Sequence, residues 1–192
     1  MKILLISFIF LFSVFLQEEK RDIKVDAGIF RVYYSETLEQ PLEVWYNVQC
    51  INGGASRKGL DFYDCDSILT SQDEDYLNNI WDKGHMAPAA DFSCDKETIH
   101  KTFTYLNCAL QHQDLNRGAW RLLEAHEREL AKSNKVDVYI KLYFDSKSIK
   151  LPTGATVPNG FRKEIKYADK IEVYYFKNEK PATNSYTTFI VK

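Results

Sequence analysis

The sequence predicts an α+β domain built around a central antiparallel sheet. Residues 136–144 alternate strictly between apolar and polar side chains, which is typical of a strand with one buried face. Residues 115–132 carry apolar side chains at helical spacing and form the best helix candidate in the chain. Aromatic residues, which favour strands, make up 14% of the sequence. A mostly antiparallel sheet with one prominent helix follows.

Further strands are expected on both sides of these two elements. Residues 42–48 alternate clearly and residues 29–34 weakly, and residues 171–176 and 186–191 complete the sheet. Residues 103–107 predict a short strand that ends at Asn107. The remaining expectations are a flexible leader over residues 18–27, a solvated acidic loop over residues 73–75, and core positions for Trp45, Trp81 and Trp120.

Length and charge limit the possible functions. The 192 residues suit one domain that is large enough to bury a core. The net charge of −2 excludes binding to polyanions through overall charge. A nucleic-acid partner would therefore need a local basic patch and a metal ion.

The N-terminus resembles a targeting segment. An apolar run over residues 3–16 follows Lys2 and ends at a charged cluster, and it is short for a bilayer span. We expect residues 1–17 to be a signal peptide or an uncleaved anchor, and residues 18–192 to be the functional domain. The first interpretation places the protein in a secreted or lumenal compartment, and the second tethers it to a membrane through residues 3–16.

Four cysteines follow the targeting segment, and an even number in an exported chain indicates two disulfides. Three pairings are possible, and the preferred one joins Cys50 to Cys65 and Cys94 to Cys108. A zinc site is the competing interpretation, but the chain has no Cys-x-x-Cys pair.

The strongest candidate for chemistry is the stretch Asp82-Lys83-Gly84-His85. Histidine takes up a proton near neutral pH, and a preceding glycine permits a sharp turn or a close approach to a ligand. The stretch is consistent with a general base at a strand end, or with a polar loop that contains an incidental histidine. We expect His100, His112 and His126 to be structural or surface residues.

Two polar residues near the predicted helix start could complete a metal site. Asn116 and Glu124 are eight positions apart and project about 80° from each other, so both can border one cleft. A neutral oxygen ligand and a carboxylate that holds water suit Mg²⁺, which keeps much of its hydration.

Four separated motifs resemble those of the DNA/RNA non-specific endonucleases, a family with secreted bacterial and mitochondrial members. They are Arg57 before Phe62 and Asp64, then Asp82 to Ala89, then Leu106-Asn107 with Gln111 and Asp114 to Glu124, and finally Val157-Pro158 with Phe161 and Lys163. They occur in the family's order and spacing between residues 41 and 163. The resemblance implies a ββα-metal finger embedded in the sheet and flanked by helices.

The resemblance also implies a Mg²⁺-dependent endonuclease that cleaves DNA and RNA without sequence or sugar preference, leaving 5′-phosphate ends. One Mg²⁺ ion is expected, with Mn²⁺ as a substitute. Four catalytic residues are implied. His85 would be the general base, and Arg57 would contact the phosphate. Asn107 would support the histidine and the position of the substrate, and Glu124 would hold the waters bound to the metal ion. The implied metal ligand is Asn116. The implied substrate-binding residues are Lys83 and Arg117.

Two departures from the family pattern keep an alternative open. Lys83 replaces the usual arginine and lacks its planar fork for two-point phosphate contact, and Leu110 replaces a frequent proline. The alternative is a weak or silent relative that serves as a structural subunit or as a nucleic-acid or protein-binding module, and it could be anchored to a membrane.

A homodimer and a location in the mitochondrial intermembrane space are further expectations. Arg117 and Arg121 either line the cleft or, like Arg128, lie on a solvated helix face.

Overall fold

The computed structural model describes residues 20–51 and 53–191. The expected targeting segment, residues 1–17, and the tether through residues 3–16 lie outside the described residues. Within the described ranges, no helix combines the length and the apolar character needed to cross a bilayer.

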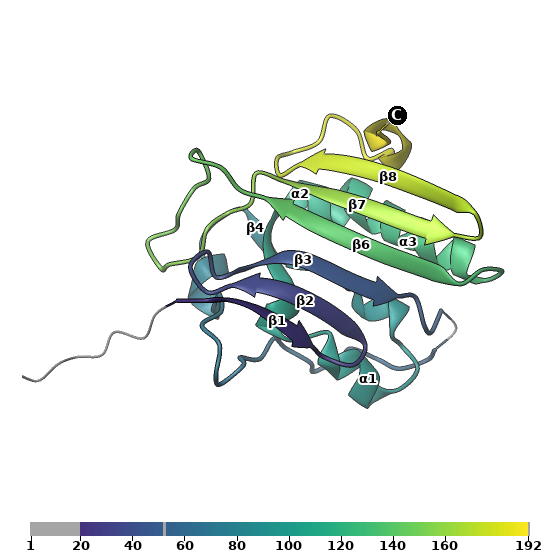
Figure 1. Ribbon diagram of the computed structural model, residues 1–192, viewed down its shortest axis with the longest axis horizontal. Coiled ribbons are helices and arrows are strands. Elements are labelled where there is room, and N and C mark those ends of the chain that lie inside the picture. Colours follow the sequence, from purple (N-terminus) through teal and green to yellow (C-terminus); the bar gives the residue numbers. More distant parts are fainter. Residues whose placement is uncertain (1–19, 52, 192) are drawn as a thin grey trace, which may run out of the picture.

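A six-stranded antiparallel sheet forms the centre of the fold, in the spatial order β1-β2-β3-β6-β7-β8 (Figure 1). Its strands are β1 (Asp22–Asp26), β2 (Phe30–Ser35), β3 (Gln40–Asn47), β6 (Val136–Tyr143), β7 (Gly160–Tyr167) and β8 (Lys170–Lys177). The predicted α+β class with a central antiparallel sheet is confirmed.

A separate two-stranded hairpin pairs β4 (Trp81–His85) with β5 (Cys108–His112). The helical elements are η1 (Asp73–Tyr76), η2 (Ala89–Asp91), α1 (Lys96–Lys101), η3 (Tyr105–Asn107), α2 (Gln113–Leu115), η4 (Asn116–Trp120), α3 (Arg121–Ala131) and η5 (Tyr186–Phe189). In Figure 1, α2 and α3 lie behind the sheet, and the near face of the sheet carries no helix among the described residues.

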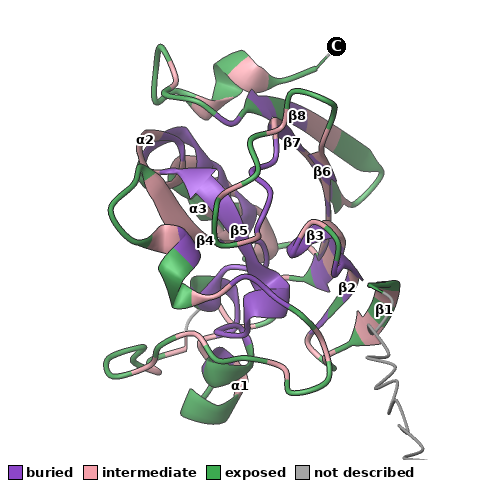
Figure 2. Cartoon of the chain, turned by 90° about the vertical axis from the view of Figure 1, so that its left-hand side faces the viewer, coloured by how far each residue is buried: buried purple, intermediate pink, exposed green. Residues whose placement is uncertain are grey.

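The core lies between the sheet and the layer formed by the hairpin and α3. Alternation along β6 buries Val136, Val138, Ile140 and Leu142, as the sequence predicts. Trp120 and Leu123 fill the space from the helical side and are fully buried. All five residues of β5 are buried as well, so this strand runs through the interior (Figure 2). The site therefore stands on a hairpin whose second strand, β5, is buried and whose first strand, β4, is partly exposed.

The predicted continuous helix over residues 115–132 is wrong. A short α-turn leads into a π-helical turn, η4, and Gly118 inside it has non-helical angles of φ −102° and ψ −111°. A Cβ at Gly118 would lie 2.3 Å from the Asn184 side-chain oxygen. The C-terminal segment therefore occupies the space that a regular helix with a larger residue would need.

Several strand predictions also need correction. Residues 22–26 form edge strand β1 rather than a flexible leader, and residues 105–107 form a 3-10 turn instead of a strand. The C-terminal stretch after 186 is a 3-10 turn, η5, followed by a single bridge to Tyr174. Strand β7 was not predicted, because Arg162, Lys163 and Glu164 hide its alternation.

Several predictions of burial differ from the structure, and Trp81, expected in the core, is only half-buried. Trp45 is only half-buried and stacks on Tyr139, with ring centroids 5.3 Å apart, instead of entering the core. Asp75, expected in a solvated loop, has 1% of its surface exposed.

In the described part of the chain one disulfide forms, Cys50–Cys94, and the preferred pairing of Cys50 with Cys65 and of Cys94 with Cys108 is wrong. Cys50 forms a parallel bridge with Phe92, which brings the Cα atoms of Cys50 and Cys94 to 5.2 Å. Cys108 instead begins the buried strand β5, and both Cys65 and Cys108 are free thiols.

Candidate active site

Hairpin β4–β5 carries the Asp82-Lys83-Gly84-His85 stretch, with His85 as the last residue of β4 and paired with Cys108. Gly84 pairs with Ala109, next to Gln111 on the partner strand. A Cβ at Gly84 would lie 2.5 Å from the Gln111 side-chain oxygen. The glycine before the histidine thus allows close packing within the hairpin and makes no turn.

The His85 imidazole lies among aromatic rings. The ring centroids of Phe62 and Phe103 are each 4.7 Å from that of His85. Burial, with a smaller contribution from the nearby charge of Arg57, lowers the pKa of His85 to about 3. The imidazole is therefore uncharged at neutral pH and free to accept a proton. Its Nε2 atom is buried and has no hydrogen-bond partner in the described protein, which suits an atom that meets water or substrate.

Asn107 is fully buried and fixes the backbone that follows His85. Its Oδ1 accepts from Ala87 N at 2.8 Å, and its Nδ2 donates to Ala87 O at 2.8 Å and to Thr102 O at 2.9 Å. All its side-chain partners are backbone atoms. Asn107 therefore holds the segment that carries the histidine, and it has no exposed surface with which to touch a substrate.

Asn116 begins the π-turn η4 and contacts β4 directly. Its Nδ2 donates to Asp82 Oδ2 at 2.9 Å. An ionised carboxylate only accepts hydrogen bonds, so the amide nitrogen must face Asp82 and the amide oxygen must point elsewhere. The same carboxylate accepts from Arg117 Nε at 2.9 Å and from Arg117 Nη2 at 2.6 Å. Asp82 belongs to the motif that resembles the family, but the motif alone assigns it no role, and in the structure it sets the orientation of Asn116.

Glu124 lies on the first turn of α3, where burial raises its pKa to about 7 while the charge of Lys163 acts in the opposite direction. Glu127 and Arg128, on the next turn, belong to buried ion pairs. Lys163 and Glu127 are both fully buried, with Nζ 2.5 Å from Oε1, and Tyr46 donates to Glu127 Oε2 at 2.6 Å.

A second ion pair joins α3 to the segment after His85. Arg128 Nη1 donates to Asp91 Oδ1 at 2.8 Å, and Asp91 is fully buried. Arg128 was expected on a solvated face, but its side chain is only 24% exposed. Helical periodicity identifies apolar faces, so it gave no sign of these buried charges. Lys163 appeared in the sequence only as part of the last family motif.

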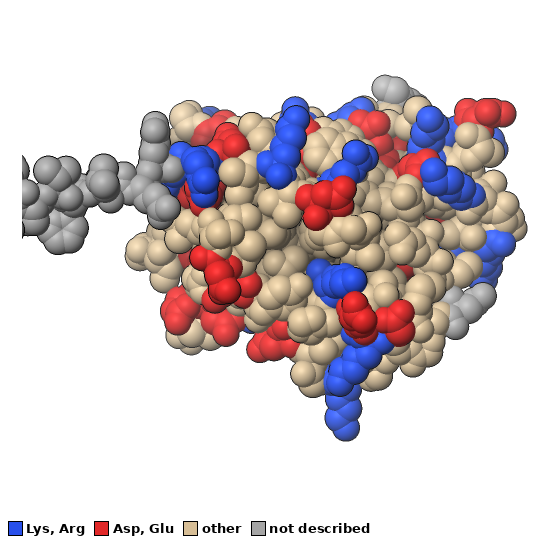
Figure 3. All heavy atoms as spheres, turned by 60° about the horizontal axis from the view of Figure 1, so that its bottom comes forward, with Lys and Arg blue, Asp and Glu red and all other residues tan. Residues whose placement is uncertain are grey.

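The two cations expected to bind substrate already have protein partners. Lys83 pairs with Asp73 and, at 3.3 Å, with Asp61. Arg117 pairs with Asp82, as described above, whereas Arg57 is exposed. On the molecular face shown in Figure 3, basic and acidic side chains are interspersed and form no large patch of one sign.

The predicted site residues lie in three groups, on or beside hairpin β4–β5 and on helix α3. His85, Lys83 and Arg57 lie together with Phe62, Asn116 and Arg117 meet at Asp82, and Glu124 stands at the ion pairs of α3. Asn116 reaches β4 three residues before His85, roughly 10 Å along the strand. The imidazole of His85 and the amide of Asn116 are therefore placed at separate points along β4.

The donor atoms fit an ion that keeps most of its water. Within residues 20–51 and 53–191, no group of three His, Cys, Asp or Glu residues could bind a metal ion by itself. The amide oxygen of Asn116 is a neutral ligand, and Glu124 offers a carboxylate on the first turn of α3. Magnesium binds in this way, through few protein oxygens, several waters and substrate phosphate.

The chain belongs to the DNA/RNA non-specific endonuclease family, whose sequence model matches residues 15–192. It is 37% identical over 83 residues to the mitochondrial nuclease EXOG of Danio rerio, a match that covers 42% of this chain and 24% of that protein. It is 32% identical over 93 residues to human mitochondrial endonuclease G, covering 47% of this chain and 31% of that protein. The chain therefore matches about a quarter to a third of the length of these relatives.

A solved structure shows the same fold. The chain aligns with the crystal structure of an EndoG/EndoGI complex with a TM-score of 0.78 and 27% sequence identity, covering 90% of this chain and 81% of that chain. The family resemblance drawn from the four sequence motifs is confirmed.

Proposed function

We propose that residues 18–192 form a Mg²⁺-dependent endonuclease that hydrolyses DNA and RNA without sequence preference. The observation that carries the proposal is the contact between Asn116 and Asp82. It occupies the amide nitrogen and leaves the amide oxygen for a ligand, beside the hairpin that also holds an uncharged histidine. Membership of the family supports the same reaction.

His85 is the general base in this proposal. It takes a proton from the attacking water while the water oxygen bonds to phosphorus and the bond from phosphorus to the 3′ oxygen breaks. The phosphate stays on the 5′ side, and the 3′ oxygen receives a proton from solvent. The negative phosphate beside the ring raises the proton affinity that burial lowers. Asn107 keeps the ring in place by fixing the backbone at Ala87.

Asn116 would hold the single Mg²⁺ ion, and Glu124 would order its waters. When bound, such an ion stabilises the charge that develops on the phosphoryl and leaving oxygens. Arg57 is the exposed cation beside His85 and would contact the phosphate. Lys83 and Arg117 would contact neighbouring phosphates. Contacts to the backbone carry no base information, so the enzyme accepts both DNA and RNA.

The experiment uses supercoiled plasmid and a structured RNA, each with Mg²⁺ or with EDTA. We expect cleavage of both substrates by the wild-type protein, no cleavage with EDTA, and a loss of about 10²–10⁴-fold for His85→Ala. His100→Ala is the matched control, because His100 lies on α1 and stacks on Tyr63 outside the site. Equal activity of His85→Ala and wild type would refute the proposed role of His85.

A second candidate function has one observation in its favour: Lys83 and Arg117 are both neutralised by carboxylates in the structure. A chain with its substrate cations occupied in this way could serve as a weak nuclease or as a binding module. Intact plasmid and RNA after prolonged incubation with Mg²⁺ and with Mn²⁺ would favour this second function.

The disulfide also bears on location. A Cys50–Cys94 bridge persists in an oxidising compartment, and we propose a secreted, lumenal or intermembrane-space location on this ground. The similar nucleases of Danio rerio and human are named as mitochondrial.

A further inference from the structure

The ammonium group of Lys83 is enclosed by two carboxylates and two aromatic rings. Lys83 Nζ pairs with Asp73 Oδ1 and lies 3.3 Å from Asp61 Oδ1. It also lies 5.6 Å and 5.5 Å from the ring centroids of Phe62 and Tyr105. One positive and two negative charges leave this part of the site with a net charge of −1. A phosphate that approaches Lys83 therefore meets two carboxylates that already accept the hydrogen bonds of the Lys83 ammonium group.

The two carboxylates differ in how firmly they are held. Asp61 has 79% of its side chain exposed, and its described side-chain partners are Lys83 and its own neighbour Phe62. Asp73 instead accepts a second hydrogen bond from Tyr105 Oη, on the same oxygen that receives Lys83. The hydrogen bond from Lys83 lowers the pKa of Asp73, so Asp73 is ionised at neutral pH.

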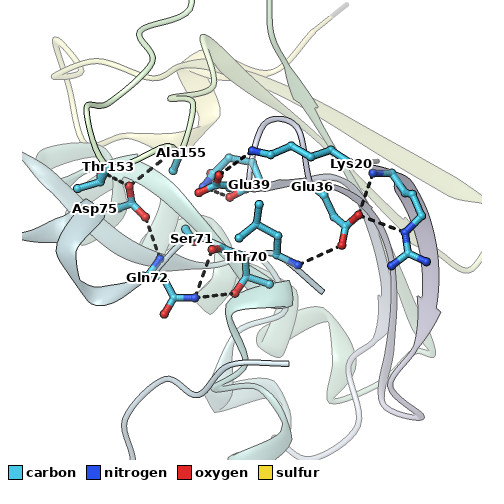
Figure 4. A network of polar contacts seen from close by, with 12 residues as sticks. Lys20, Glu36, Glu39, Thr70, Ser71, Gln72, Asp75, Thr153 and Ala155 are labelled. Atoms are coloured by element: carbon cyan, nitrogen blue, oxygen red, sulfur yellow. Dashed lines mark hydrogen bonds and ion pairs between the residues drawn. The ribbon is translucent and has the colours of Figure 1, made fainter. Parts of the chain in front are cut away.

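The turn that presents Asp73 is anchored by its neighbour Asp75. Asp75 Oδ2 accepts from Gln72 N at 2.8 Å, and Asp75 Oδ1 accepts from Thr153 Oγ1 and from Ala155 N (Figure 4). Asp75 is 1% exposed, so these bonds are shielded from water. They join η1 to the loop before β7. The backbone that carries Asp73 is consequently anchored beside Lys83, and the Asp73 side chain itself is 59% exposed.

We infer that Asp73 is an internal competitor of the substrate phosphate for Lys83 and weakens the binding of nucleic acid at this part of the site. The inference rests on the proposed nuclease function. Removing one charge in contact with the ammonium group should strengthen binding of a phosphate to Lys83 by about three- to tenfold. The gain should shrink as salt rises, because the Debye length falls from about 30 Å at 0.01 M to about 8 Å at 0.15 M.

The test compares Asp73→Asn with the wild type. Asparagine has nearly the same shape, and its amide oxygen can still accept from Lys83 and Tyr105, so Lys83 stays in place while the negative charge is lost. Asp66→Asn is the matched control, because Asp66 is exposed on the preceding loop and has no recorded ion pair in the described part of the chain. It changes the net charge equally.

Two measurements are made on each variant: KM and kcat for cleavage of a fluorescent single-stranded oligonucleotide with Mg²⁺, and equilibrium binding of the same oligonucleotide in EDTA. We expect a three- to tenfold lower KM and tighter binding for Asp73→Asn at low salt, a smaller effect at 0.15 M, and wild-type behaviour for Asp66→Asn.

The outcomes separate this inference from the function on which it rests. If the wild type cleaves the oligonucleotide but Asp73→Asn has an unchanged KM, or a reduced kcat, the competitor role is wrong and the nuclease function stands. A reduced kcat would mean that Asp73 holds Lys83 in its productive position. If the wild type neither cleaves nor binds, both the function and the inference fall.

Discussion

On one side of the candidate site the titratable group lies among aromatic rings, whereas on the other it lies among buried charges. His85 packs between Phe62 and Phe103 and has no ion partner in the described residues. Glu124 stands beside two ion pairs that tie α3 to the sheet and to the segment after β4. Burial favours the neutral form of both groups and so lowers the pKa of His85 and raises that of Glu124.

This difference suggests that the aromatic side carries out the reaction and that the ionic side stabilises the fold. On the aromatic side, His85 can gain or lose a proton without any ion pair being broken, which suits a general base that takes up and releases a proton in each turnover. The ionic side fixes helix α3, because a buried charge that loses its partner is strongly unfavourable. We therefore expect substitutions on the aromatic side to change activity most, and substitutions on the ionic side to change stability most.

The largest expected effect on stability comes from breaking the buried pair between Lys163 and Glu127. Lys163→Met leaves the Glu127 carboxylate buried without its cation, and we expect the free energy of unfolding to fall by about 3–5 kcal/mol. Chemical denaturation at pH 7 measures it.

The double variant Lys163→Met/Glu127→Gln is the control for that prediction. Glutamine carries no charge and still accepts the hydrogen bond from Tyr46, so most of the lost stability should return. A double variant as unstable as Lys163→Met would show that the loss arises from packing and not from the unpaired charge.

A smaller effect, with opposite signs on the two sides, is expected from pH. The folded pKa of His85, about 3, lies below its ordinary 6.5, so its contribution to stability is present above pH 6.5 and is lost as pH falls towards 3. The folded pKa of Glu124, about 7, lies above its ordinary 4.5, so its contribution is present below pH 4.5 and is lost as pH rises through 7. Between pH 4.5 and 6.5 the two slopes oppose each other.

Single variants should reveal each slope. In that window Glu124→Gln should make stability rise with pH more steeply than in the wild type, and His85→Ala should make it rise less or fall. Each change is at most about 1.4 kcal/mol per pH unit. Thermal unfolding from pH 4 to 8 measures the slopes, and the double variant should return to the wild-type profile. Parallel profiles for all four proteins would contradict the assignment.

The buried charges of the ionic side are the reason that part of the fold could not be predicted from the sequence. Strand β6 was predicted because its inward positions are all apolar, but β7 was missed because one of its buried positions is Lys163. A lysine at a core position can be recognised only when its partner Glu127 is known, and that partner lies 36 residues away on a helix. The aromatic side was found from the Asp82-Lys83-Gly84-His85 motif, since its chemistry is local.

Contacts between distant segments account for the other differences. The long helix breaks at Gly118, where Asn184 approaches from the C-terminal segment. The disulfide depends on the bridge that brings Cys50 beside Phe92. By contrast, motif order alone assigns Asn107, Asn116 and Glu124 to one site, but it does not show that Asn107 contacts Ala87 or that Asn116 contacts Asp82.

The smallest expected effect concerns Arg117, which belongs to the exposed rim of the site. Its side chain is 67% exposed, so Arg117→Ala should change the free energy of unfolding by no more than about 1 kcal/mol despite the two hydrogen bonds to Asp82. If Arg117 contacts a substrate phosphate, the variant should bind an oligonucleotide more weakly, and the slope of log binding constant against log salt should fall by about 1. Lys132→Ala, at the far end of α3, is the control and should keep the wild-type slope. An unchanged slope for Arg117→Ala would mean that Arg117 serves only to hold Asp82, and through it Asn116, in place.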